Sequence, residues 1–341
     1  MSHAIMPLQE SHFPLSQSLN GLDKCPLISV IVPIFKTQQY LEKCLNSITS
    51  QTLSDIEVIC VDDCSPDDSA KIIEHLALTD HRIHLIRHKV NLGSGGARNT
   101  GIRAARANYI ASVDSDDYID PQFLECLYAP VLETNSTVDL VIAGFRRVDP
   151  SGSIISKFEP KSLDITNNNH SIDIFHLSNP GFCNKLWRRS LFADNNLWLP
   201  NHVYYEDLAT TPRILTFCRC IRIIPDIHYN YLIRSDSTTH TISDKHLLDY
   251  IRVFSLLRDF LISQNLIDRY SQEFDAAVNS AFKFHANNSN NANIQETEKK
   301  LYLQQLLFLK LGFVDHADRV TQLSIQELVE NISLPNKIKQ S

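Results

Sequence analysis

The chain of 341 residues is 43% hydrophobic and 21% charged, a composition ordinary for a globular enzyme. Its formal net charge of -7 argues against a nucleic-acid-binding protein, because a phosphate backbone requires a net basic face. No stretch is long and apolar enough to cross a bilayer, so we expect a cytoplasmic protein. Peripheral association with the inner face of the cell membrane stays open.

The N-terminal half alternates buried strands with amphipathic helices. Its β-branched runs predict strands that are covered on both faces, and apolar residues at helical spacing follow most of them. Strands are expected at residues 27–32, 56–61, 82–87, 109–113 and 138–144, and helices at residues 40–48, 69–78, 95–107 and 121–133. Such alternation predicts an α/β fold with a Rossmann-like, mostly parallel sheet flanked by helices.

The C-terminal half has weaker patterns. Residues 149–179 are polar and Asn-rich, which fits either a surface excursion or a pair of strands. We expect helices at residues 186–191 and 205–217, and a helical chain after about residue 243, with amphipathic stretches at 247–261 and 301–311. The predicted division is a flexible arm over 1–25, a catalytic domain over 26–240 and a helical region over 241–341.

Four polar or glycine-rich clusters directly follow predicted strands. They are Pro33-Ile34-Phe35, Asp62-Asp63, residues 91–96 and Asp114-Ser115-Asp116-Asp117. In a parallel sheet the strand ends meet at one edge, and ligands bind there near the point where the strand order reverses. The four clusters together predict one binding site.

The acidic run Asp114 to Asp117 carries most of the chemical information. Carboxylates this close raise one another's pKa unless a cation lies between them. Mg²⁺ or Mn²⁺ would satisfy them, completing its shell with phosphate oxygens and water. The alternative is an acidic helix N-terminus, which needs no ligand.

The other clusters suit a nucleotide. Asp62 and Asp63 could accept an N–H from a base or bind ribose, or they could only cap the next helix. Phe35 could stack on a base, or belong to the core. Gly93 to Gly101, with Arg98 in the first turns of a helix, would cradle a diphosphate, although the segment is neither a P-loop nor a dinucleotide fingerprint.

The order of these motifs resembles the family 2 glycosyltransferases of bacterial surface-polysaccharide synthesis. The segments SVIVPIF, VICVDDCSPDDS, NLGSGGARNTGI, YIASVDSDDYIDP, NKLWRRSLF and YYEDLA follow in the order of that family over residues 27 to 235. The resemblance implies a GT-A fold, a UDP-sugar donor, a bound Mn²⁺ or Mg²⁺ and inversion at the transferred sugar. It also implies a glycan acceptor, as an oligosaccharide or a lipid-linked chain of a capsule, lipooligosaccharide or O-antigen.

The resemblance assigns roles to individual residues. Asp207 would be the general base, and Asp117 would bind the metal together with Asp116, which would also hold the ribose or the sugar. The residues implied to bind the donor are Pro33, Phe35, Asp62, Asp63, Gly93, Arg98, Asp114, Asp116 and Arg234. The residues implied near the acceptor are Asn184, Lys185, Trp187 and Glu206.

Two other readings remain at this point. A nucleotidyltransferase would also join a nucleotide site to metal-binding aspartates, but it would carry a basic glycine-rich loop where this chain has Pro33-Ile34-Phe35-Lys36. A nucleotide-sugar-binding or glycan-binding protein that had kept the fold and lost catalysis would have no need to retain both Asp117 and Asp207. The C-terminal helices could in addition serve as a scaffold that docks a membrane synthase.

Overall fold

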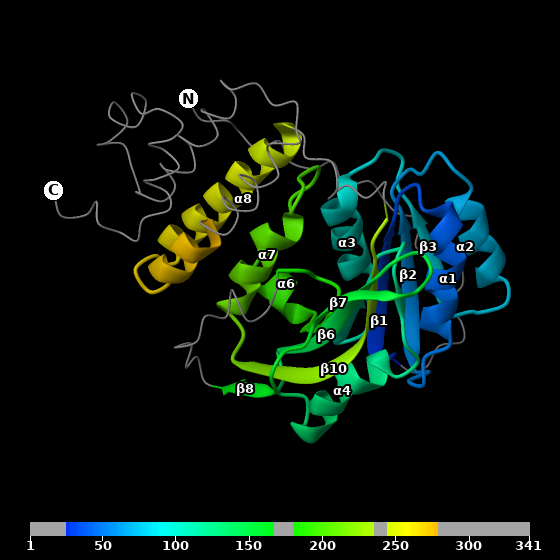
Figure 1. Ribbon diagram of the computed structural model, residues 1–341, viewed down its shortest axis with the longest axis horizontal. Coiled ribbons are helices and arrows are strands. Elements are labelled where there is room, and N and C mark those ends of the chain that lie inside the picture. The colour runs from blue at the N-terminus through cyan, green and yellow to red at the C-terminus, as the bar shows by residue number, and fades with distance from the viewer. Residues whose placement is uncertain (1–24, 167–179, 235–243, 279–341) are drawn as a thin grey trace.

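The computed structural model describes residues 25–166, 180–234 and 244–278 (Figure 1). The strands are β1 Ile28–Ile34, β2 Ile56–Asp62, β3 Ile83–Arg87, β4 Tyr109–Ser112, β5 Tyr118–Ile119, β6 Leu140–Val148, β7 Ile154–Phe158, β8 Leu163–Thr166, β9 Lys185–Arg188 and β10 Cys220–Leu232. The helices are α1 Gln38–Thr49, α2 Ser69–Ala77, α3 Gly93–Ala104, α4 Phe123–Glu133, α6 Ser190–Asp194, α7 Glu206–Leu215 and α8 Asp244–Ser263.

One sheet runs through the described chain in the order β3-β2-β1-β4-β9-β6-β10-β5. Its first four strands are parallel, and every residue of β1 and β2 is buried, as their β-branched runs predict. The strand order reverses at β1, which has β2 on one side and β4 on the other. The carboxyl ends of β1 and β4 therefore form the crevice where such folds bind ligands.

Two hydrophobic cores lie on opposite faces of this sheet. One face packs against α1, α2 and α4, and the other against α3, α6, α7 and α8 (Figure 1). At Gly101 of α3, a Cβ would lie 2.5 Å from Cγ2 of Ile31, so glycine permits the close approach of this helix to β1. Phe254 and Leu257 of α8 belong to the same core as Ile214 of α7.

The α/β fold and the five predicted strands of the N-terminal half are confirmed, with boundary shifts of a few residues. Helix α3 begins two residues earlier than expected, at Gly93, and ends at Ala104. The two-residue strand β5 was not predicted. The expected arm over 1–25 lies almost entirely outside the described residues, as does the stretch 301–311.

The second half of the sheet corrects the sequence analysis. The expected helix at 186–191 is wrong, because residues 185–188 form strand β9 between β4 and β6, antiparallel to both, and helix α6 begins only at Ser190. Pairing on both edges overrides a local pattern that also suits a helix. Strand β10 was not predicted at all. Within 149–166 there are two strands, but β7 pairs with β6 and β8 with β10 rather than with each other.

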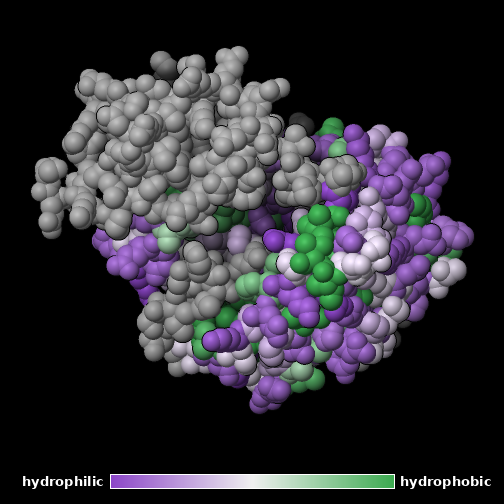
Figure 2. Space-filling model, viewed as in Figure 1, coloured by the Kyte–Doolittle hydropathy of each residue, from purple (hydrophilic) through white to green (hydrophobic). Residues whose placement is uncertain are grey.

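No helix among the described residues is long and apolar enough to span a membrane. In Figure 2 the face turned to the viewer is mainly hydrophilic, and its hydrophobic residues lie in separate small groups. The large hydrophobic side chains that are exposed in the described chain are Phe35, Leu78, Val90, Leu132, Ile154, Ile155 and Ile262. They are spread over the molecule, which is ordinary for a protein surface.

Candidate active site

Asp63, directly after β2, holds the glycine loop that opens α3. Its Oδ1 accepts the backbone N–H of Leu92 and its Oδ2 that of Gly93, both at 2.8 Å, and His88 Nδ1 lies 2.6 Å from Oδ1. Gly93 has a φ of +78°, a backbone conformation that glycine adopts without strain. Asp63 therefore fixes the shape of this loop, and its predicted contact with a base stays a prediction.

Asp62 and Phe35 border the same crevice. The carboxylate of Asp62 is 1% exposed and accepts the N–H of Ser65 at 3.0 Å, in the loop before α2, so it does not cap that helix, which begins at Ser69. Phe35 is 42% exposed, so the alternative that it belongs to the core is wrong. Its ring offers a flat apolar face beside β1, while Pro33 is buried within that strand.

The three carboxylates of the acidic run differ in their surroundings. Asp117 is 2% exposed and accepts the Tyr229 O–H at 2.6 Å and the Leu232 N–H at 2.8 Å. The side chain of Asp114 is 29% exposed and that of Asp116 is 22% exposed, and each pairs with an arginine. The two carboxylates that a ligand can reach are thus Asp114 and Asp116.

The charges of this run disfavour one another. Burial raises the pKa of Asp116, and the charge of Asp114 raises it further, although Arg234 Nε at 2.8 Å partly compensates. Burial, followed by Asp116 and Asp114, raises the pKa of Asp117. A hard divalent cation would relieve this repulsion, and carboxylate oxygens are the ligands it prefers. The acidic run therefore suits Mg²⁺ or Mn²⁺.

Arg98 of α3 joins the acidic run to α7. Its Nη2 lies 2.6 Å from Asp114 Oδ1, and its Nη1 forms an ion pair with Glu206. The guanidinium is buried and lies 5.7 Å from the centre of the Phe182 ring. Burial alone would lower its pKa, but Asp114 and Glu206 raise it well above the ordinary value, so Arg98 stays charged. One buried cation thus sets the spacing between two distant segments.

Asp207 lies in the first turn of α7, next to Glu206. The helix follows Tyr205, whose φ of 62° is left-handed and turns the chain sharply into it. Burial, and then the charge of Glu206, raises the pKa of Asp207 to about 7. A carboxylate with that pKa can both take and release a proton near neutral pH.

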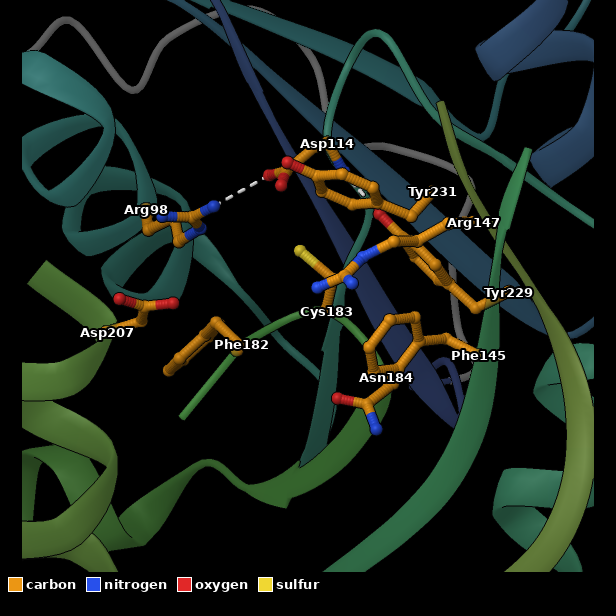
Figure 3. Close-up of a pocket in the computed structure, with 11 residues that line it drawn as sticks. Arg98, Asp114, Phe145, Arg147, Phe182, Cys183, Asn184, Asp207, Tyr229 and Tyr231 are labelled. Carbon is orange, nitrogen blue, oxygen red and sulfur yellow. Dashed lines mark hydrogen bonds and ion pairs between the residues drawn. The ribbon is translucent and has the colours of Figure 1, made fainter. Parts of the chain in front are cut away.

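A pocket of about 200 Å³ joins these groups (Figure 3). Asp207 and Arg147 reach into it from opposite sides, and Arg98 lies between Asp207 and Asp114. The lining residues are Arg98, Asp114, Phe145, Arg147, Gly181, Phe182, Cys183, Asn184, Asp207, Tyr229 and Tyr231. The structure therefore brings the predicted donor residues Arg98 and Asp114 together with the predicted base.

The sequence analysis missed the wall opposite Asp207. That wall carries Phe145 and Arg147 from β6, and Tyr229 and Tyr231 from β10. Alternating apolar residues between 220 and 232 could have revealed β10, although Pro225 interrupts the pattern. Arg147 has no carboxylate partner within the described chain, and its guanidinium carbon lies 5.9 Å from the centre of the Phe145 ring.

The residues predicted near the acceptor lie mainly behind the pocket. Lys185 is fully buried, and its Nζ donates to Gly181 O at 2.5 Å and to Asn184 Oδ1 at 2.9 Å. Burial lowers the pKa of Lys185 to about 7. Trp187 is buried and stacks on Phe182 at 5.0 Å. These two residues support the wall that Phe182 and Asn184 form, and only Asn184 of the NKLW segment lines the cavity.

Comparisons with known proteins agree with this geometry. Residues 29–194 match Glycosyl transferase family 2. The chain is 31% identical over 261 residues to EpsH of Bacillus subtilis, covering 74% of each chain. It is 34% identical over 242 residues to the glycosyltransferase GlyG of Streptococcus pneumoniae, covering 67% of this chain and 78% of that protein.

A solved structure has the same fold. Residues 1–349 of TarS from Staphylococcus aureus, in complex with UDP-GlcNAc, superpose with a TM-score of 0.69 at 21% sequence identity. The match covers 89% of this chain and 89% of that one. At this identity the likeness is evidence for the fold alone.

Proposed function

The chain belongs to glycosyl transferase family 2 and is a glycosyltransferase, and from this premise we propose the reaction that it catalyses. A UDP-sugar is the donor, and a hydroxyl of a bacterial surface glycan is the acceptor. The transferred sugar inverts its anomeric configuration. The TarS structure that contains UDP-GlcNAc supports a uridine nucleotide at the shared fold. A capsule, lipooligosaccharide or O-antigen chain is the proposed acceptor.

One observation carries the proposal. Asp114 of the acidic run and Asp207 line the same pocket, although they are far apart in the sequence. Arg98 joins them through its ion pairs with Asp114 and Glu206. A site with a donor-binding carboxylate at one end and a carboxylate of pKa about 7 at the other suits the transfer of a sugar from a phosphate oxygen to a hydroxyl oxygen.

The proposed step is a single in-line displacement. The acceptor oxygen attacks the anomeric carbon, and the bond from that carbon to the β-phosphate oxygen breaks. The proton of the acceptor hydroxyl goes to the carboxylate of Asp207, and the electron pair of the broken bond leaves with UDP. No protein nucleophile is required, since inversion takes one displacement rather than two.

Asp116 and Asp114 would hold the divalent metal. When bound, the ion would neutralise charge that develops on the departing diphosphate. The resemblance implies that Asp117 binds the metal as well. However, Asp117 is buried and both of its oxygens accept hydrogen bonds, which favours a role in supporting the acidic run. Arg234 already contacts Asp116 and would be within reach of the same diphosphate.

The acceptor would enter beside β6 and β10. Phe145 and Tyr231 offer aromatic faces, which commonly pack on sugar rings, and Arg147 adds a positive charge. If the acceptor is lipid-linked, the enzyme would work at the inner face of the cell membrane. In this proposal the catalytic domain covers residues 26–240, and α8 belongs to the region that follows it.

The test is a screen of UDP-sugars for metal-dependent transfer or hydrolysis. The active donor is then assayed with Asp207→Asn, which keeps the shape of the side chain and removes the base. Asp259→Asn, an exposed change on α8, is the matched control. We expect Asp207→Asn to lower kcat on the order of 10³-fold with little change in donor affinity, and the control to match the original enzyme. Donor binding without turnover in the unaltered enzyme would instead support a non-catalytic binding protein.

A further inference from the structure

Cys126, Asp226 and His228 form a cluster outside the pocket. Cys126 lies on α4, and the other two lie on β10. One ligand atom from each, a thiol sulfur, a carboxylate oxygen and an imidazole nitrogen, lies within 4.8 Å of the other two. All three residues are partly exposed, so an ion from solution can reach them. From this cluster we propose a Zn²⁺ site that clips α4 to β10.

Strand geometry explains why these residues meet. Asp226 and His228 are two positions apart on β10, within the stretch where its pairing with β6 is irregular. Pro225 has no N–H to donate, and the pairing of β10 with β6 shifts register between Ile223 and Ile227. The irregular pairing continues to Tyr229. Such bulges re-aim side chains, often beside functional sites.

A neighbouring carboxylate prepares His228 as a ligand. Its Nδ1 lies 3.3 Å from Asp120 Oδ2, and the Asp120 N–H donates to the backbone oxygen of His228 at 2.8 Å. The Asp120 carboxylate also accepts a hydrogen bond from Asn230 Nδ2 at 2.9 Å and forms an ion pair with Arg146. Donation of the Nδ1 proton to Asp120 leaves Nε2 with its lone pair. A carboxylate behind a histidine is the usual support for a metal-binding imidazole.

Thiolate, imidazole and carboxylate together favour Zn²⁺ over the harder ions. In tetrahedral zinc sites the ligand atoms lie roughly 3.3–3.8 Å apart, which small rotations of Cys126 and Asp226 would reach. Binding of the ion would release the proton of the Cys126 thiol, because a thiolate is the form that ligates Zn²⁺. Water would fill the fourth position.

The site would act on the acidic run through β10. Tyr229, the residue after His228, donates to Asp117, and Asn230 donates to Asp120. An ion that fixes His228 would therefore stiffen the strand that holds the acidic run. This role is structural, and it does not depend on the proposed donor or acceptor.

Metal binding by the full-length chain tests the proposal. The protein is stripped with a chelator and titrated with Zn²⁺ in competition with a chromophoric chelator, and then with Co²⁺, whose thiolate charge-transfer absorption reports a Co–S bond. We expect one equivalent with such a band, lost in Cys126→Ser and in His228→Gln. We also expect Asp120→Asn to weaken Zn²⁺ binding about tenfold.

Controls separate this site from the acidic run, which also binds divalent ions in our proposal. Cys183 lines the pocket with Asp114, and Cys64 is an exposed thiol elsewhere, so Cys183→Ser, Cys64→Ser and Asp116→Asn should all keep the band. Saturating Zn²⁺ should raise the Tm of the original chain and not that of Cys126→Ser. A band that survives Cys126→Ser, disappears in Cys183→Ser, or never forms would overturn the proposal.

Discussion

The two halves of the sheet meet at one pocket but hold their charged side chains differently. In the parallel half, β1 to β4, Asp62 and Asp63 are buried and accept backbone N–H groups. On the side of β6, β10 and α7, Asp207 has a raised pKa and Arg147 has no carboxylate partner among the described residues. In the first half the charged side chains hold loops in place, whereas in the second half Asp207 and Arg147 line the cavity.

The acidic run lies between these halves and contains both kinds of carboxylate. Asp117 resembles Asp63, since hydrogen bonds occupy both of its oxygens. Asp114 and Asp116 are reachable and repel each other, as a metal site requires. Hydrogen bonding and exposure therefore separate two kinds of carboxylate. Those whose oxygens accept hydrogen bonds within the protein support the site, and those that are exposed to the crevice bind ligands.

The largest effect should separate Asp116 from Asp117. Asp116→Asn should lower kcat/KM on the order of 10³-fold and abolish metal dependence, because it removes a reachable ligand, with little change in Tm. Asp117→Asn should lower Tm clearly and retain measurable metal-dependent transfer. Both are followed by transfer assays across a Mn²⁺ titration and by thermal unfolding. Loss of metal dependence in Asp117→Asn but not in Asp116→Asn would instead identify Asp117 as the metal ligand.

Replacing Arg98 should damage both stability and catalysis. Arg98→Met removes the buried cation that Asp114 and Glu206 share, which costs about 3–5 kcal/mol of the free energy of unfolding. Misplacement of the two ends of the site should lower kcat about 100-fold. Urea unfolding and steady-state kinetics measure the two effects, and Arg98→Lys should recover only part of each, since lysine lacks the fork that bridges two carboxylates. Equal activity in both variants would refute the bridging role.

Tyr229→Phe tests the support that β10 gives to the acidic run. The change removes the hydroxyl that donates to Asp117 and accepts the N–H of Asp114. We expect a loss of about 1–3 kcal/mol in the free energy of unfolding, with kcat within tenfold of the original value. Phe35→Leu is the control on the exposed side of the crevice, and it should leave stability nearly unchanged while weakening UDP binding.

The smallest effect concerns the cost of holding Asp207 in its site. Its folded pKa of about 7 lies above the ordinary value of 3.8, so the folded protein binds more protons than the unfolded one between these values. This contribution to stability is fully present below pH 3.8 and is lost as pH rises through 7. Asp207→Asn should therefore raise Tm by more than about 2 °C at pH 8 and by less at pH 5. A pH-independent difference would contradict the raised pKa.

The sequence predicted the parallel half well, because its signals are local. Buried β-branched runs identify β1 and β2, and the aspartates at or just after the ends of β2 and β4 reveal the edge where ligands bind. The second half was predicted poorly. Lys185 to Arg188 become a strand only through pairing with β4 and β6, and Pro225 hides the period of β10.

The contacts within the site have no local signal either. Tyr229 and Asp117 are 112 residues apart, and Arg98 and Glu206 are 108 apart. The motifs identify the carboxylates of the site. Which carboxylate oxygens accept hydrogen bonds within the protein depends on these distant partners. Arg147 and Phe145 belong to no motif, so only the folded sheet reveals the wall opposite Asp207.

The pH dependence of kcat tests the central claim most directly, that Asp207 is the base of the transfer. With donor, acceptor and metal saturating, we predict that kcat is constant above pH 8 and falls tenfold per unit below about pH 7, as one carboxylate is protonated. The residual activity of Asp207→Asn should lose this limb. A kcat that stays constant down to pH 5, or a limb that persists in Asp207→Asn, would contradict the account.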